Sequence, residues 1–235
     1  MIGTMPVRIT VRETGVSDSP DDLAILDASE RTRAGRKREA APFVTGHALV
    51  RRVLGELLDR DPAALEFARR CATCGSDQHG KPSLVDAPGW HFSLSYTGAG
   101  AIVAVARGVE VGVDIEDLTD ADFEGFARTT LAADEVAGFG SLDGHDLLVA
   151  RARVWARKEA VLKATGRGLV VDPSEVLVSG PGEPARLVDW RADEPRPAQI
   201  SLADVDVDVD VDVTTIDHQA AVAALTDEQL VVEPT

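Results

Sequence analysis

VEVGVDIE, the sequence of residues 109–116, alternates between branched apolar side chains and a set made of acidic residues and one glycine. Because successive side chains of a β-strand point to opposite faces, this alternation predicts a strand over residues 109–115 with its valines and isoleucine on one face. Asp114 and Glu116 share the other face about 7 Å apart, close enough for both carboxylates to reach one hard cation. Gly112, on that same face, is expected to leave room for a ligand. An edge strand with a solvated acidic face is the alternative interpretation.

A second amphipathic segment follows some forty residues later. Residues 146–164 have the apolar spacing of a helix, and Trp155, Glu159 and Lys163 lie at i, i+4 and i+8 on one stripe of it. On an exposed helix the Glu159–Lys163 pair would contribute only about 0.3–0.5 kcal/mol. In a cleft facing Asp114 and Glu116, Glu159 would complete a site for a divalent cation, and Lys163 would meet the phosphates that Mg²⁺ usually shares.

The rest of the chain repeats one order of elements, helix then strands, twice. This order predicts an α+β fold built as a pair of similar halves that meet near residues 106–109. The expected domains are residues 1–106 and 107–225, followed by a frayed tail over residues 226–235. Residues 71–88 are expected to form a loop, and Pro42 is expected to lie in the first turn of its helix. Predicted helices cover residues 29–58, 61–69, 123–127 and 132–139; predicted strands cover residues 90–96, 101–107, 176–179, 185–190, 200–215 and 219–225.

Composition limits the class of protein and of partner. The 235 residues are 44% apolar and 27% charged, which is typical of a globular chain with a core. A net charge of −16 disfavours nucleic acid and anionic membranes as partners. Only two cysteines are present, and no run approaches the roughly 20 apolar residues of a membrane span. We therefore expect a cytoplasmic protein without a membrane or nucleic-acid partner.

Basic residues gather in two islands of this acidic chain. Residues 31–70 hold ten Lys and Arg against five acidic residues, and residues 151–168 hold six against one, so each island carries a net charge of +5. Such local positive charge favours a small, phosphate-rich ligand over an extended polyanion. Two solvated helix faces are the alternative.

Two motifs in a fixed order carry a family resemblance. VGVDIE at residues 111–116, followed by WARKEAVLK at 155–163 and GRGL at 166–169, resembles the paired signature of the 4'-phosphopantetheinyl transferases of the two-lobed surfactin-synthetase (Sfp) type. Upstream, GKP at 80–82 and FSLSYTG at 92–98 resemble the family's GKP and FNISHSG elements. The similarity extends over residues 25–225. It implies a pseudo-twofold pair of similar α+β lobes, with coenzyme A and Mg²⁺ bound between them.

The resemblance also implies a role for each matched residue. Asp114, Glu116 and Glu159 would hold Mg²⁺ on the pyrophosphate of coenzyme A, with Glu159 or a metal-bound water as base. Lys163 would neutralise the pyrophosphate, so that the catalytic set is Asp114, Glu159 and Lys163. Lys158 would assist Lys163 in contacting coenzyme A. The contacts implied at its 3'-phosphate end are Lys81 and Ser95, together with basic residues among Arg31, Lys37 and Arg38.

Tyr96 departs from the family pattern. The family usually has a histidine here that contacts the phosphate of the nucleotide, whereas tyrosine donates one hydrogen bond and brings no positive charge. We therefore expect either weaker nucleotide affinity or replacement of that histidine by His91 or His47.

The activity implied is that of a holo-[acyl-carrier-protein] synthase type enzyme. A monomer would transfer phosphopantetheine from coenzyme A to a serine of an acyl- or peptidyl-carrier protein, as in polyketide or nonribosomal peptide synthesis, and would release 3',5'-ADP. One alternative is a Mg²⁺-dependent hydrolase of nucleotide pyrophosphates, which would use water as the nucleophile. Another is a non-catalytic acidic protein whose alternating Val-Asp tract at residues 204–213 binds Ca²⁺. That tract otherwise predicts a half-buried strand.

Cys71 and Cys74, with His79 nearby, resemble half of a zinc site. A structural zinc site needs four ligands, and the chain has no other cysteine. We therefore expect no zinc.

Overall fold

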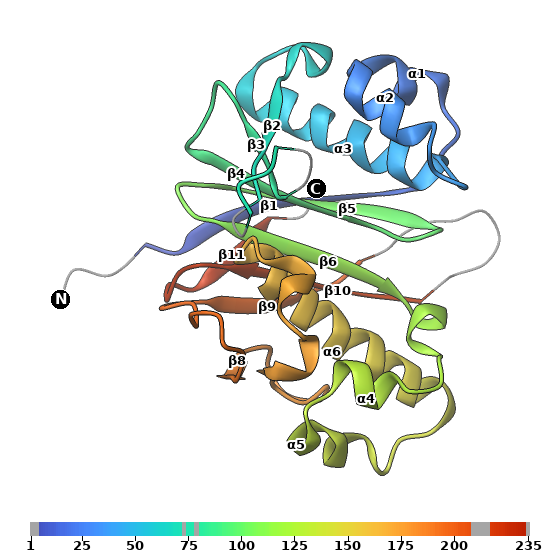
Figure 1. Cartoon of the computed structure of the whole chain (residues 1–235), viewed down its shortest axis with the longest axis vertical. Coiled ribbons are helices and arrows are strands. Elements are labelled where there is room, and N and C mark those ends of the chain that lie inside the picture. The colour runs from blue at the N-terminus through green and yellow to red at the C-terminus, as the bar shows by residue number, and fades with distance from the viewer. Residues whose placement is uncertain (1–4, 72–73, 78–79, 208–216, 234–235) are drawn as a thin grey trace.

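The computed structural model describes residues 5–71, 74–77, 80–207 and 217–233. Its main body has four layers, in which two sheets pack face to face between two long helices (Figure 1). The prediction of an α+β fold is confirmed. The layers are helix α3 (Ala41–Leu58), the sheet β11 (Leu230–Glu233), β1 (Val7–Gly15), β5 (Gly100–Arg107) and β4 (Trp90–Tyr96), the sheet β6 (Val111–Asp117), β10 (His218–Ala224) and β9 (Ser201–Val205), and helix α6 (Gly144–Ala164).

Strand β5 is buried on both of its faces. Ile102 and Ala104 point into the core between the two sheets, whereas Val103 and Val105 pack toward α3. A strand with two buried faces must be apolar at every position, which explains the continuous run AIVAVA at residues 101–106. The sheet that contains β5 therefore lies between α3 on one face and the second sheet on the other.

Strand β6 begins and ends two residues later than predicted, and its two faces have different environments. Val111, Val113 and Ile115 enter the core between the sheets, as the alternation predicts. Gly112 faces α6 at very short range, because a Cβ atom built on it would lie 2.1 Å from the Ala160 carbonyl oxygen. The expectation that Gly112 leaves room for a ligand is wrong, since the backbone of α6 fills that space.

The helix predicted over residues 29–58 is two helices, α2 (Ala28–Ala34) and α3. Gly35 ends α2, and Pro42, which has no N–H to donate, lies in the first turn of α3. Arg51 of α3 holds the two helices together. Its fully buried guanidinium donates to Glu30 and Asp27, 2.7 and 2.9 Å away, and to the carbonyls of Pro62 and Leu65. Helix α1 (Pro20–Ile25) precedes this pair.

The helix predicted over residues 61–69 is wrong in its second part. A 3₁₀ turn, η1 (Pro62–Ala64), is followed by strand β2 (Phe67–Arg69), which pairs with β3 (Pro82–Leu84) inside the predicted loop. Pairing with a distant segment overrides the local preference here, as is common for short elements.

The second half adds short elements around α6. The helices predicted over residues 123–127 and 132–139 are present near those positions, and the two strands predicted over 176–179 and 185–190 form a hairpin. Of the Val-Asp tract, β9 includes only the first two residues, and residues 208–216 lie outside the described residues. These elements are η2 (Leu118–Ala121), α4 (Phe126–Thr130), α5 (Ala133–Val136), η3 (Ala137–Phe139), η4 (Gly168–Val170), η5 (Pro173–Glu175), β7 (Val176–Val178) and β8 (Leu187–Trp190).

Both ends of the chain join one sheet. Strand β1, which the sequence analysis did not predict, pairs antiparallel with β5 and parallel with β11. The expected frayed tail is therefore wrong for Leu230–Glu233, because β1 supplies hydrogen-bond partners for those residues. The domain boundary near residue 106 stays a prediction.

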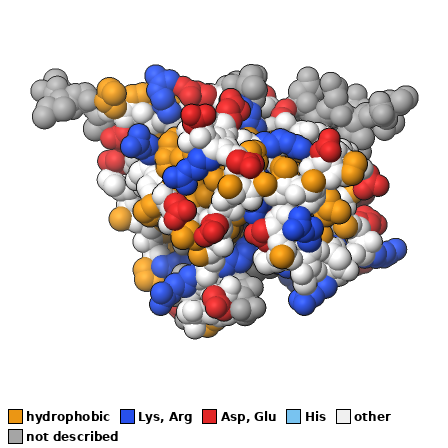
Figure 2. Space-filling view, turned by 90° about the horizontal axis from the view of Figure 1, so that it is seen from above, with side chains coloured by type: hydrophobic (Ala, Val, Ile, Leu, Met, Phe, Trp, Pro, Cys, Tyr) orange, Lys and Arg blue, Asp and Glu red, His pale blue; other side chains and the backbone are white. Residues whose placement is uncertain are grey.

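No helix among the described residues is long and apolar enough to cross a membrane. Figure 2, seen from the end of the molecule that carries α1, α2 and α3, shows acidic and basic side chains interspersed over this face. This end presents no continuous field of one sign.

Replacing Gly112 by alanine is expected to destabilise the fold by about 3 kcal/mol or more, since the new methyl group meets rigid backbone atoms of Ala160 and Ala164. Gly98→Ala is the matched control, because a Cβ atom there meets nothing within 4 Å. Urea unfolding of both variants measures the effect. Near wild-type stability of Gly112→Ala would contradict this account of the packing.

Candidate functional site

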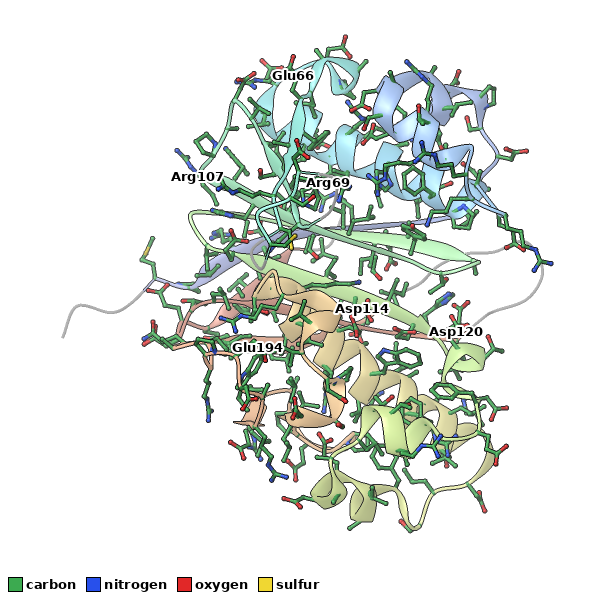
Figure 3. All side chains as sticks on the ribbon, viewed as in Figure 1. Glu66, Arg69, Arg107, Asp114, Asp120 and Glu194 are labelled. Atoms are coloured by element: carbon green, nitrogen blue, oxygen red, sulfur yellow. The ribbon has the colours of Figure 1, made fainter. Side chains whose placement is uncertain are left out.

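The carboxylates singled out in the sequence lie between β6 and α6. Asp114 and Glu116 project from β6 on the face that packs against α6, and Glu159 and Lys163 come from α6 one turn apart. Figure 3 shows Asp114 at this junction, with Arg69 on the α3 side of the molecule. The structure therefore brings together the four residues of the two motifs.

Asp114 is the most buried member of this group, at 2% exposed. Its Oδ1 atom accepts hydrogen bonds from the Lys163 ammonium at 2.5 Å and from the Ser95 hydroxyl at 2.7 Å. Among the described residues, its Oδ2 atom is buried with no hydrogen-bond partner. One oxygen of this carboxylate is thus saturated, and the other lacks a positive or hydrogen-bonding group.

The three carboxyl groups influence one another. Burial raises the pKa of Glu159 to about 7; the charge of Asp114 adds to the rise, while Lys163 and a hydrogen bond from Trp155 oppose it. Burial and the adjacent Asp114 carboxylate also raise the pKa of Glu116 well above its ordinary value. Glu116 can donate a hydrogen bond to Asp114 only by taking up a proton, and Lys163 is the one positive charge that the pKa shifts of both glutamates include.

This arrangement fits a hard divalent cation. Carboxylate oxygens are the ligands that Mg²⁺ prefers, and a cation near Asp114 Oδ2 would supply the missing partner. Across the described ranges, no three His, Cys, Asp or Glu side chains already stand at ligand spacing. Glu116 and Glu159 therefore have to turn toward Asp114 to share an ion with it, which their partly exposed side chains allow.

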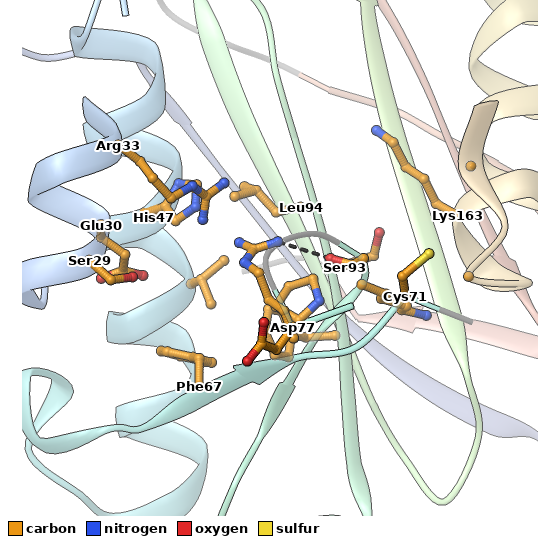
Figure 4. Close-up of a pocket in the computed structure, with 18 of the residues that line it drawn as sticks. Ser29, Glu30, Arg33, His47, Phe67, Cys71, Asp77, Ser93, Leu94 and Lys163 are labelled. Carbon is orange, nitrogen blue, oxygen red and sulfur yellow. Dashed lines mark hydrogen bonds between the residues drawn. The ribbon is translucent and has the colours of Figure 1, made fainter. Parts of the chain in front are cut away.

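A cavity of about 720 Å³ adjoins the carboxylates, within the size range of pockets that hold small molecules. Figure 4 shows Arg33 and His47 on one side of it and Lys163 on the other. Its lining comes from both halves of the chain, because Arg33 and His47 belong to the first half and residues 166–168 follow α6 in the second. Lys163 contacts both the cavity and Asp114, and so joins the two parts of the site.

The basic side chains of the cavity are only partly those predicted. Arg33 and Arg69 line it, and neither was singled out from the sequence. Of the predicted set, Arg31 lines a separate pocket beside α1, and Lys37 and Arg38 are absent from the lining of the main cavity. Whether these three contact coenzyme A stays a prediction. On α2, Arg31 and Arg33 lie two positions apart and therefore do not face the same way.

Arg33 and Arg69 bring positive charge to the first-half side of the cavity. Burial lowers the pKa of Arg69, and the nearby charge of Arg33 adds to the effect. Asp27 and Glu30 also line the cavity, but both are paired with Arg51. One guanidinium offsets only one of these two carboxylates, and Asp77 lines the cavity as well, so this side is close to neutral. Over the whole lining, five basic side chains against three acidic ones leave a net charge of +2 for an anion.

Tyr96 lines the cavity, with its ring edge-on to Phe43. His47 is stacked on the same Phe43 ring and also lines the cavity, whereas His91 is paired with Glu110 outside the lining. Burial, with a contribution from the nearby arginines, lowers the pKa of His47 to about 3. Of the two histidines considered as replacements for the family's histidine, only His47 lines the cavity, and its lowered pKa favours the neutral ring at neutral pH.

Lys81 also lines the cavity, but its ammonium is already engaged. It contacts Glu110 at 2.6 Å and donates to the Val111 carbonyl at 2.7 Å, so that it ties β3 to the start of β6. Burial lowers its pKa, and Glu110 opposes that change.

Ser95 and Lys158 are not where the resemblance implies. Ser95 bonds Asp114 and Lys163 and is absent from the cavity lining, so that it does not face the 3'-phosphate end. Lys158 is fully buried and uses its three N–H groups on Glu135 and on the carbonyls of Thr130 and Pro173. Lys158 is therefore a structural residue.

Cys71 lines the cavity, Cys74 is exposed, and His79 lies outside the described residues. The first part of the Val-Asp tract is also engaged, because Asp204 accepts hydrogen bonds from Nε and Nη2 of the buried Arg157, at 2.7 and 2.6 Å. Neither segment presents a metal centre within the described residues.

Comparison with known proteins points to one family. Residues 110–223 match the model of the 4'-phosphopantetheinyl transferase superfamily. The chain is 30% identical over 178 residues to 4'-phosphopantetheinyl transferase HetI of Nostoc sp., which covers 73% of this chain and 72% of HetI. It is 31% identical to a putative 4'-phosphopantetheinyl transferase of Synechocystis sp., over 67% of this chain and 64% of that relative. Identity to Sfp of Bacillus subtilis is 26%, over 63% of each chain.

The match to HetI covers more than two thirds of both chains and includes the two motifs that meet at Asp114. The family match spans β6, α6 and most of β10, which are the elements that hold the carboxylates. The chain therefore belongs to the 4'-phosphopantetheinyl transferase superfamily.

Proposed function

We propose that this chain transfers the 4'-phosphopantetheine group of coenzyme A to a serine of an acyl- or peptidyl-carrier protein, with Mg²⁺, releasing 3',5'-ADP. The observation that carries the proposal is the double contact of Lys163. Its ammonium pairs with buried Asp114 and also lines the basic cavity. A phosphate in that cavity would therefore lie beside the carboxylates.

The cavity has basic side chains from both halves of the chain, as binding of a donor with separated phosphate groups requires. Lys163 and Arg167 stand at the carboxylate end, where we place the pyrophosphate of coenzyme A. Arg33 and Arg69 stand at the other end, where we place the 3'-phosphate. Phe67, Phe92 and Leu94 supply apolar lining between the charged groups.

Asp114, Glu116 and Glu159 would hold the Mg²⁺, which supplies charge neutralisation on the pyrophosphate when bound. Glu159, which lies beside Asp114 and one turn from Lys163 on α6, would act as the base. The serine oxygen attacks the β-phosphorus and gives its proton to Glu159, and the bond from that phosphorus to the bridging oxygen breaks. Lys163 stabilises the negative charge that develops on the departing 3',5'-ADP.

Because residues of both halves line one cavity, a single chain contains every group that the proposal uses. We therefore propose a monomer, acting on a carrier protein with coenzyme A as donor. Fatty-acid, polyketide and nonribosomal peptide carriers are all candidates, and a panel of apo carrier proteins analysed by mass spectrometry would identify the one served.

Replacing Asp114 by Asn or Glu159 by Gln is expected to lower the transfer rate by at least about 100-fold, because each change removes a cation ligand, and the second also removes the base. Glu66→Gln, an exposed change far from Asp114 in Figure 3, is the control. The mass of an apo carrier incubated with coenzyme A and Mg²⁺ reports transfer.

An unmodified carrier mass with the wild-type chain, across several carriers, would overturn the proposal. Release of phosphopantetheine in the absence of any carrier would instead indicate a pyrophosphate hydrolase. Wild-type transfer by either site variant would exclude the assignment of the carboxylates.

Arg33→Ala is expected to raise the KM for coenzyme A about tenfold or more, since a charged hydrogen bond to a phosphate is lost. Arg31→Ala is the matched control, because Arg31 lies on the same helix and lines a different pocket. Steady-state kinetics at fixed carrier concentration measure both values. Equal effects of the two changes would contradict the placement of the 3'-phosphate.

Binding of 3',5'-ADP is expected to raise the pKa of His47, since a phosphate near Arg33 and Arg69 offsets the positive charge that helps to lower it. NMR titration of the His47 ring, identified with His47→Gln, measures this pKa; a pKa that does not rise on binding would count against an anion at this end.

Without ligand, the lowered pKa of His47 stabilises the folded state fully above pH 6.5, and this contribution to the free energy of unfolding is lost as the pH falls toward 3.

A further inference from the structure

Ser95 lies where the two sheets of the molecule meet. Strand β4, which carries it, is the edge of the first sheet, and β6, which carries Asp114, is the edge of the second; these two strands lie in contact. The Ser95 hydroxyl donates to Asp114 Oδ1 at 2.7 Å and accepts from the Lys163 ammonium at 2.9 Å. Lys163 closes the triangle by its own contact with Oδ1 at 2.5 Å.

This triangle acts on only one of the two carboxylate oxygens. Asp114 Oδ1 receives two hydrogen bonds, and Oδ2 receives none from the described residues. Two donors on one oxygen fix the plane of the carboxylate, so that the direction of the second oxygen is fixed as well. Ser95 is 8% exposed, and solvent therefore competes little for its hydroxyl.

We infer that Ser95 is a positioning residue for the divalent cation, because its hydroxyl holds Asp114 so that Oδ2 faces the space shared with Glu116 and Glu159. The inference rests on the proposed function, since it takes Asp114 as a cation ligand. On this inference, the Ser95 hydroxyl of β4 acts at the cation site and does not contact the 3'-phosphate of the donor. Ser93, two residues earlier on the same strand, lines the cavity, whereas Ser95 does not.

Cation binding tests the inference without the reaction. Titration of the full chain with Mn²⁺ alone, followed by calorimetry and by the electron paramagnetic resonance of free Mn²⁺, gives a dissociation constant for each variant. Ser95→Ala is expected to weaken Mn²⁺ binding by about 10- to 100-fold, as loss of a group that orients a ligand does. Ser95→Thr keeps a hydroxyl and is expected to restore most of the affinity. Ser93→Ala is the matched control and is expected to bind Mn²⁺ like the wild type.

The choice of donor separates the two roles of Ser95. Coenzyme A and dephospho-coenzyme A differ by the 3'-phosphate, so a residue that contacts this phosphate matters for the first donor only. If Ser95 orients Asp114, Ser95→Ala lowers kcat by the same factor with both donors and leaves the KM ratio of the two donors unchanged. A defect confined to coenzyme A, with normal Mn²⁺ affinity, would overturn the inference.

Failure of this inference is distinguishable from failure of the proposed function. Wild-type Mn²⁺ binding and transfer, together with unchanged Mn²⁺ affinity in Ser95→Ala, would overturn the positioning role alone. A wild-type chain that neither binds Mn²⁺ nor modifies a carrier would overturn both. Circular dichroism and thermal melting of each variant confirm that losses of affinity come from a folded protein.

Discussion

The close approach of β6 to α6 at Gly112 brings together the strand and the helix that carry the carboxylates of the candidate site. A strand and a helix that carry side chains at their contact are held well apart, whereas a glycine lets the two backbones touch. Asp114 and Glu116 then lie within reach of Glu159 and Lys163, which project from the same side of α6. Burial and the charge of Asp114 raise the pKa of both glutamates at this contact.

Asp114 is also the place where the two halves of the chain depend on each other. Its carboxylate comes from the second half, and one of its hydrogen-bond donors, Ser95, comes from the first. The cavity beside it is lined in the same way, with Arg33 and Arg69 from one half and Arg167 from the other. Residues from both halves of the sequence thus form the candidate site, and neither half alone carries all of them.

The sequence predicted those parts of the site that depend on local periodicity. Alternation in β6 assigned Asp114 and Glu116 to one face, and helical spacing assigned Glu159 and Lys163 to one stripe. The alternating residues of β1 carried a comparable signal that was not used, since Ile9 and Val11 are buried and Arg8 is exposed. Gly35 likewise marks the break between α2 and α3.

The remaining differences concern contacts between segments far apart in the sequence. Whether Arg31 or Arg33 faces the cavity depends on how α2 is rotated, and Arg51, 18 or more residues away, fixes that rotation through Glu30 and Asp27. Lys158 stands in the middle of a functional motif, but its partners Thr130, Glu135 and Pro173 come from segments whose approach no local pattern reveals. Strand β11 has only four residues, and its partner lies at the opposite end of the chain.

The parallel pairing of β1 with β11 brings the two ends of the fold into register, with Val7 opposite Leu230 and Thr10 opposite Glu233. A peptide that joined Glu233 back to Val7 would need to reach only about 11 Å, a distance that a few residues cover. The first and last strands of the fold are therefore neighbours in one sheet. A circular permutant, in which a short linker joins Glu233 to Val7 and the new termini lie at a surface turn such as the one around Gly98, is therefore expected to keep the same tertiary structure.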